Sequence, residues 1–196
     1  MIHLPDVTLV AMTGKGYKTK EHWDALNKSS EKIRFGDVKL IEQENIKDIN
    51  DWNKAIVYDL ADYISTNHAI LIHSDGYIIN PKLWDSDWLF YDFIGAPFPL
   101  PQDDFSYRDI NGKIQRVGNS VSLRSKKLMG LPKKLNMEWK PFHGFYNEDG
   151  FISVNMRHIF EENGCRFAPL SVAKYFSKEH EIPENVGLKT FAFHSL

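Results

Sequence analysis

Hydrophobic residues in the first half of the chain form short runs that alternate with segments of helical spacing. Residues 7–12, 38–41 and 69–72 are apolar runs typical of buried strands. Between them, apolar side chains recur at three- and four-residue steps in residues 19–33 and 50–65, which predicts two helices. This β-α-β-α-β order predicts a parallel sheet with crossover helices. Thr19 and either Asn50 or Asp51 are the expected caps of the two helices.

The second half has a less regular pattern. Residues 93–99 predict a strand that meets a proline-rich turn, and residues 117–124 predict another strand, followed by a helix from about Ser125. A further helix over residues 151–163 should end at Gly164, because glycine adopts the left-handed conformation that often ends a helix. The expected fold class is α/β, with a mostly parallel twisted sheet flanked by helices and a short antiparallel addition.

Length and composition fit one domain over residues 1–196. With 42% apolar residues the chain can build one sizeable core, and it contains no internal repeat or convincing linker. The chain starts almost at its first strand and stops just past His194, so this domain could also be excised from a longer protein.

The charge and cysteine content exclude several classes of protein. A net charge of −2 and the lack of a basic run argue against a nucleic-acid partner. The single cysteine, Cys165, permits no internal disulfide and favours a reducing compartment. Neither a signal peptide nor an apolar stretch of about 20 residues is present, so we expect no transmembrane segment and a soluble, cytoplasmic protein.

The third apolar run leads directly into the polar residues His73, Ser74 and Asp75. In parallel sheets, ligands bind beyond the carboxyl ends of the strands. A carboxylate at that place suits a divalent cation such as Mg²⁺ or Mn²⁺, and Mn²⁺ also accepts imidazole nitrogen. The alternative is a simple turn, because the sequence Asp75-Gly76 favours turns.

Five sequence blocks in a fixed order resemble the small GT-A-type glycosyltransferase domains of bacteria and large DNA viruses. They are the strand ending in the single Asp75, Ile94-Gly95-Ala96-Pro97, the segment from Gly118 to Ser125, the pair Glu148-Asp149, and Phe193-His194. The resemblance covers nearly the whole chain. It implies a GT-A fold and transfer of a hexose from a UDP- or TDP-sugar to a hydroxyl of a glycan or glycoprotein, with Mn²⁺ or Mg²⁺ at the diphosphate.

The same resemblance assigns the metal ligands. Asp75 takes the place of the last aspartate of the Asp-x-Asp signature, whereas His73 replaces the first, and His194 approaches the metal from the far terminus. The local alternative for His194 is a histidine packed between aromatic side chains. The replacement by His73 also leaves open a catalytically silent module that binds a nucleotide-sugar.

The resemblance also suggests how the acceptor is activated. Glu148 and Asp149 occupy the position where inverting enzymes keep the general base, and Asp149 is the expected base, with Glu148 as the alternative. Both residues would also suit the first turn of a helix for purely structural reasons, because acidic groups there interact favourably with the helix dipole.

The donor is expected to lie beyond the first and third strands. Its predicted contacts are Ala11, Thr13, Gly14, Lys15, His73, Ser74, Asp75 and Arg124. Arg124 would hold the diphosphate, since arginine forms bidentate bonds to phosphate. The alternatives are an ordinary strand-to-helix turn at Lys15 and a surface salt bridge at Arg124. A sugar-phosphate nucleotidyltransferase is a rival function. Such enzymes usually carry a glycine-rich, basic phosphate loop after the first strand, which Thr13-Gly14-Lys15-Gly16 resembles only weakly.

Two aromatic clusters accompany these blocks. The first follows the third strand and is expected to belong to the core: Trp84, Trp88, Phe90 and Tyr91. The second precedes the acidic pair, and one or two of its members are candidates for an acceptor platform: Trp139, Phe142, Phe145 and Tyr146.

Overall fold

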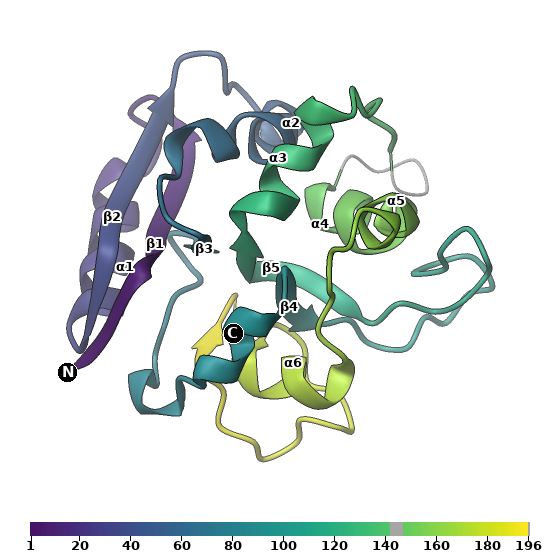
Figure 1. Ribbon diagram of the computed structural model, residues 1–196. Coiled ribbons are helices and arrows are strands. Elements are labelled where there is room, and N and C mark those ends of the chain that lie inside the picture. Colours follow the sequence, from purple (N-terminus) through teal and green to yellow (C-terminus); the bar gives the residue numbers. More distant parts are fainter. Residues whose placement is uncertain (142–146, 196) are drawn as a thin grey trace.

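The computed structural model describes residues 1–141 and 147–195, and its centre is a five-stranded sheet (Figure 1). The strand order is β2-β1-β3-β5-β4. The strands are β1 (Ile2–Gly14), β2 (Ile33–Gln43), β3 (His68–Leu71), β4 (Phe93–Pro97) and β5 (Val117–Ser125). β1 pairs in parallel with β2 and β3, whereas β5 runs antiparallel to both β3 and β4. The predicted α/β architecture with an antiparallel addition is therefore confirmed.

Both faces of the sheet are covered, which explains why its central strands are apolar runs. Along β1, Leu9 and Ala11 face a cluster that includes α1 (Thr19–Ser30) and α6 (Leu170–Phe176). The alternate residues Val10 and Met12 face α2 (Ile49–Tyr58) and α3 (Lys126–Lys134). The same division of the helices is visible in Figure 1. No helix within residues 1–141 and 147–195 is long and apolar enough to span a membrane.

The predicted helix caps were wrong by one to three residues. α1 begins after Lys18, which has a φ of 49°, so Thr19 is its first helical residue. Asp48 caps α2, and its carboxylate accepts the backbone N–H groups of Asn50 and Asp51. A 3-10 turn, η1 (Leu60–Tyr63), follows α2 closely.

The single helix predicted over residues 151–163 is replaced by two elements, and a further short turn precedes them. A short turn, α4 (Glu148–Gly150), leads into a π turn, η4 (Phe151–Asn155), and then into α5 (Arg157–Glu162). Gly164 follows with a φ of 76°, as predicted. Strand β5 passes directly beside the π turn, because a Cβ on Gly118 would lie 2.0 Å from Oγ of Ser153. This close approach fixes the π turn, and the hydroxyl of Ser153 in that turn donates to the carbonyl of Asp149 in α4.

The third strand ends at Leu71, one residue before the end of the apolar run 69–72. The N–H of His73 donates to the carbonyl of Gly76 (2.8 Å), which closes a tight turn. Ile78 then bridges to Ala192 in the C-terminal strand β7 (Ala192–Phe193), whose parallel partner is β6 (Ser177–Lys178). The end of the chain consequently runs alongside residues 75–78.

The first aromatic cluster lies around two 3-10 turns, η2 (Pro81–Leu83) and η3 (Ser86–Phe90). Trp88 is buried at 4% exposure and packs against Phe176 and Phe191, so it belongs to the core as expected. Phe90, by contrast, is 65% exposed. In the second cluster, Trp139 packs on Phe151. The remaining members of that cluster lie outside the described residues: Phe142, Phe145 and Tyr146.

Candidate functional site

A cleft of about 950 Å³ opens at the carboxyl ends of β1 and β3. Its walls come from the loop after β1, the start of α2, the turn after β3, α4 and the C-terminal segment. Most of the residues predicted to form a site line this cleft: Thr13, Gly14, Lys15, His73, Ser74, Asp75, Glu148, Asp149 and His194. Ala11 does not, because its side chain is fully buried inside the sheet.

Asp75 and His194 meet on one wall, although 119 positions of sequence separate them. Oδ1 of Asp75 lies 3.4 Å from Nε2 of His194. The C-terminal segment holds this pair together: the N–H of Ser195 donates to the carbonyl of Asp75 (3.1 Å), and its hydroxyl lies 3.2 Å from Oδ2 of Asp75. The two ligand candidates are therefore brought together by backbone pairing as well as by their own charges.

The opposite edge of the His194 ring faces a residue that the sequence analysis missed. Nδ1 of His194 lies 3.3 Å from Oε2 of Glu179. Burial by itself would lower the pKa of His194, but the carboxylates of Glu179 and Asp75 raise it above its ordinary value. Burial likewise opposes ionisation of Asp75, yet His194 brings the pKa of Asp75 below its usual range. Glu179 stands in a short polar segment without any recognisable motif, so its local sequence offers no signal.

His73 packs against the ring of His194, and its own imidazole is neutral. Its ring centroid is 4.8 Å from that of His194 and 5.4 Å from that of Trp52. Burial, together with the charge of His194, lowers the pKa of His73 to about 3. Its Nε2 has no hydrogen-bond partner in the described part of the chain. His73 thus presents an uncharged imidazole beside His194 in the lining of the cleft.

Arg124 was predicted to contact a diphosphate, but in the structure it is the buried partner of Glu148. Its side chain is 1% exposed, and its Nη2 lies 2.8 and 2.9 Å from the two carboxylate oxygens of Glu148. Its Nε donates to Oγ of Ser122 (2.8 Å), and the guanidinium lies over the ring of Phe93. Because it is buried against Glu148, Arg124 does not line the cleft.

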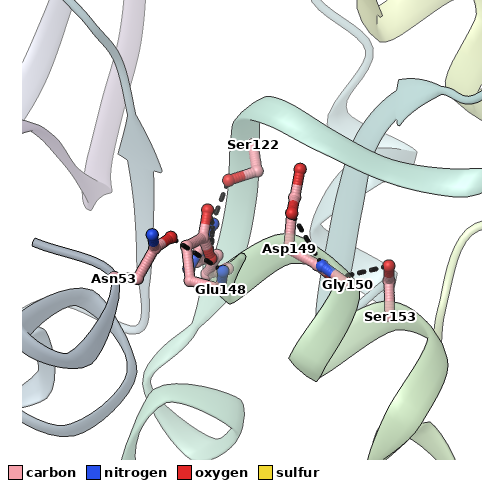
Figure 2. A network of polar contacts seen from close by, with 7 residues as sticks. Asn53, Ser122, Glu148, Asp149, Gly150 and Ser153 are labelled. Carbon is pink, nitrogen blue, oxygen red and sulfur yellow. Dashed lines mark hydrogen bonds and ion pairs between the residues drawn. The ribbon is translucent and has the colours of Figure 1, made fainter. Parts of the chain in front are cut away.

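Glu148 is correspondingly a buried partner of Arg124. Figure 2 shows Glu148 within this polar network, with its backbone N–H donating to Oδ1 of Asn53 on α2 (2.8 Å). Although Arg124 favours the charged form, the larger effect of burial raises the pKa of Glu148. An ion pair so enclosed holds the start of α4 in place, and it leaves Glu148 poorly placed to exchange protons with a ligand.

The side chain of Asp149 points away from that of Glu148 (Figure 2). Asp149 also lines the cleft. Its Oδ1 accepts the N–H of Gly150 (2.7 Å), and its carbonyl accepts the hydroxyl of Ser153. Burial, reinforced by the nearby charge of Glu148, raises the pKa of Asp149 to about 7. A carboxyl group with such a pKa can accept a proton near neutral pH.

Part of the lining of the cleft is apolar. Met12, Ile46, Ile49 and Trp52 form this part. The indole N–H of Trp52 donates to the carbonyl of Met12 (2.7 Å), which fixes the orientation of the ring. Lys15 lies at the rim in an exposed ion pair with Glu44 (2.5 Å). The sequence analysis had placed Trp52 on a helix without assigning it to a site.

Among the charged side chains that line the cleft, acidic ones outnumber basic ones. Against Lys15 and Lys47 it has six carboxyl groups, from Glu44, Asp48, Asp75, Glu148, Asp149 and Glu179. A polyanionic ligand would therefore need a cation between itself and the wall. Asp75 and His194 fit this requirement, since adjacent oxygen and nitrogen ligands of one ion, each about 2.1 Å from it, lie about 3 Å apart. No three His, Cys, Asp or Glu side chains of the described ranges form a cage by themselves.

Comparisons with known proteins agree with this fold. A crystal structure described as that of a glycosyltransferase involved in the glycosylation of the major capsid of PBCV-1 superimposes with a TM-score of 0.57. The match covers 96% of this chain and 91% of that chain at 15% sequence identity, so the likeness concerns the fold. No curated protein sequence matches the chain. The profile of a family described as "Protein of unknown function (DUF5672)" matches residues 36–194, and the chain belongs to this family.

Proposed function

We propose that this protein is a metal-dependent glycosyltransferase of the GT-A type, which transfers a hexose from a UDP- or TDP-sugar to a hydroxyl of a glycan or glycoprotein. The observation that carries the proposal is the 3.4 Å approach of Asp75 Oδ1 to His194 Nε2 inside a cleft that also holds Asp149. The likeness in fold to a glycosyltransferase supports it.

The apolar part of the cleft lining would receive the nucleoside. Trp52 and Ile49 offer flat and aliphatic surfaces to a base, and the loop from Thr13 to Lys15 lies next to them. Asp75 and His194 would hold Mn²⁺ or Mg²⁺. The cation would neutralise the charge that develops on the diphosphate as the sugar leaves. The side chains of the wall are poorly suited to this alone, because the acidic ones outnumber the two lysines.

Asp149 would act as the general base. With a pKa of about 7 it is partly ionised near neutral pH, so it can take the proton of the acceptor hydroxyl while that oxygen attacks the sugar carbon. A single displacement of this kind inverts the configuration of the sugar carbon. Arg124 and Glu148 would serve the reaction indirectly, because their ion pair holds the turn that carries Asp149.

Calorimetry with UDP, in the presence and absence of Mn²⁺, tests the proposal. We expect binding that depends on Mn²⁺ and that is lost in Asp75→Asn and His194→Ala but retained in Asp24→Asn, an exposed carboxylate outside the cleft. Absence of metal-dependent binding by the wild-type protein would contradict the proposal and favour a catalytically silent module.

A second assay separates the two enzyme classes. The protein is incubated with UDP- or TDP-sugars and with a panel of glycans, and in parallel with a sugar 1-phosphate and a nucleoside triphosphate. Release of nucleoside diphosphate in the first reaction supports a glycosyltransferase. Release of pyrophosphate in the second would instead identify a nucleotidyltransferase.

A further inference from the structure

We infer that Glu179 is a positioning residue, which holds His194 in the tautomer with its proton on Nδ1 and leaves the lone pair of Nε2 directed at Asp75. The inference rests on the proposed function only where it assigns that lone pair to a metal ion. The tautomer itself is a property of the protein without metal.

The two edges of the His194 ring face two different carboxylates. Nε2 lies 3.4 Å from Oδ1 of Asp75, and Nδ1 lies 3.3 Å from Oε2 of Glu179. Glu179 is 16% exposed, whereas Glu181, two positions later, is 65% exposed. Within the described residues, Nδ1 of His194 and Oε2 of Glu179 are buried atoms for which no hydrogen bond of regular geometry is formed, and the 3.3 Å ion-pair contact joins the two.

Backbone pairing imposes this arrangement. β6 and β7 run in parallel, with Lys178 opposite Phe193, and the N–H of His194 donates to the carbonyl of Lys178 (2.9 Å). Glu179 directly follows β6 and His194 directly follows β7, so this pairing places the two residues side by side. Since Glu179 comes from the segment that pairs with the end of the chain, its contact with His194 is built into the fold.

The chemistry of imidazole then decides the role of Glu179. A neutral imidazole carries one N–H and one lone pair, and the hydrogen bond at one nitrogen determines which nitrogen keeps the proton. A metal ligand must present its lone pair, and histidine ligands generally donate their other N–H to a carboxylate or carbonyl. Glu179 can accept the proton of Nδ1, so Nε2 and Asp75 can both face the cation.

Nitrogen NMR of the metal-free protein in alkaline buffer, where the imidazole is neutral, tests the inference. The wild-type protein should show His194 with its proton on Nδ1. Glu179→Ala and Glu179→Met, which remove the acceptor, should shift the population toward a proton on Nε2, where Asp75 can accept it. Glu179→Gln retains an acceptor oxygen and should largely restore the wild-type tautomer, and Glu181→Ala should not alter it.

Metal affinity gives an independent measurement. Loss of such an outer partner typically weakens metal binding 10–100-fold. We expect a loss of this size for Mn²⁺ in the presence of UDP in the Glu179→Ala and Glu179→Met variants, and near-wild-type affinity in Glu181→Ala.

Failure of this inference is distinguishable from failure of the proposed function. A wild-type protein that binds no Mn²⁺ with UDP would overturn the proposed function. The NMR measurement of the His194 tautomer would still test the role of Glu179, because it uses the metal-free protein. An Nδ1–H tautomer that persists in both the alanine and methionine variants would overturn the role of Glu179.

Discussion

The backbone of Gly76 lies directly against the imidazole ring of His194. A Cβ on Gly76 would sit 2.6 Å from Cδ2 of His194 and 3.0 Å from Cγ2 of Val121. The C-terminal segment can pass beside the turn after β3 only because residue 76 has no side chain. The requirement is steric, since Gly76 does not have a positive φ.

We therefore expect Gly76→Ala to displace His194. Overpacking of this kind typically costs about 1–3 kcal/mol of unfolding free energy, and the displaced ring should also weaken Mn²⁺-dependent UDP binding. Chemical denaturation and calorimetry measure the two effects. Gly130→Ala is the matched control: its Cβ would meet nothing within 4 Å, and alanine in the interior of α3 favours the helix.

A second prediction concerns the Arg124–Glu148 ion pair. Removing one partner from a buried pair typically costs about 3–5 kcal/mol, because the other charge remains buried without compensation. Arg124→Met and Glu148→Leu should each lower the free energy of unfolding by this amount. The double variant should be less destabilised than the sum of the two, as a double-mutant cycle in urea would show. Simple additivity would mean that the two charges do not stabilise each other.

The raised pKa of Asp149 predicts how stability depends on pH. The folded protein keeps the proton of Asp149 up to a pH of about 7, whereas the unfolded chain releases it near the ordinary value of 3.8. Between these values the folded state binds more protons, so this group's contribution to stability falls as pH rises. Asp149→Asn should remove this fall and be more stable than the wild type above pH 7. Denaturation at several pH values measures the difference, and Asp24→Asn should follow the wild-type curve.

The same group predicts a pH profile for activity. If Asp149 takes the acceptor proton, the transfer rate should rise with pH through about 7 as its carboxyl group ionises. Asp149→Asn should lose both the rate and this ascending limb while it retains Mn²⁺-dependent UDP binding. An Asp149→Asn variant with most of the wild-type rate would point to a retaining mechanism without a strong base.

The orientation of Trp52 predicts its contribution to donor binding. Stacking of a base on an aromatic side chain is worth about 1–3 kcal/mol, so Trp52→Ala should weaken UDP binding by about 5- to 150-fold. Trp52→Phe keeps an aromatic face and should lose less. Trp23→Ala, on the exposed side of α1, is the control. Equal affinity in all three variants would place the base elsewhere in the cleft.

The sequence by itself determined the central layer of this protein. Apolar runs such as residues 69–72 identify strands that are buried on both faces, and their alternation with helical segments fixes a parallel sheet. The position of Asp75 follows from the same pattern, because a parallel sheet directs its strand ends to one edge. These features depend on local periodicity and on general rules of chain connection.

The tertiary structure alone decided which polar groups meet. Arg124 and Lys15 are equally plausible phosphate ligands in a linear sequence, but the pairing of β5 with β3 turns Arg124 inward to Glu148. Glu179 meets His194 because two short strands pair, and such strands are too short to leave a periodic signal. Contacts of this kind depend on the register between distant segments, which no local pattern of residues contains.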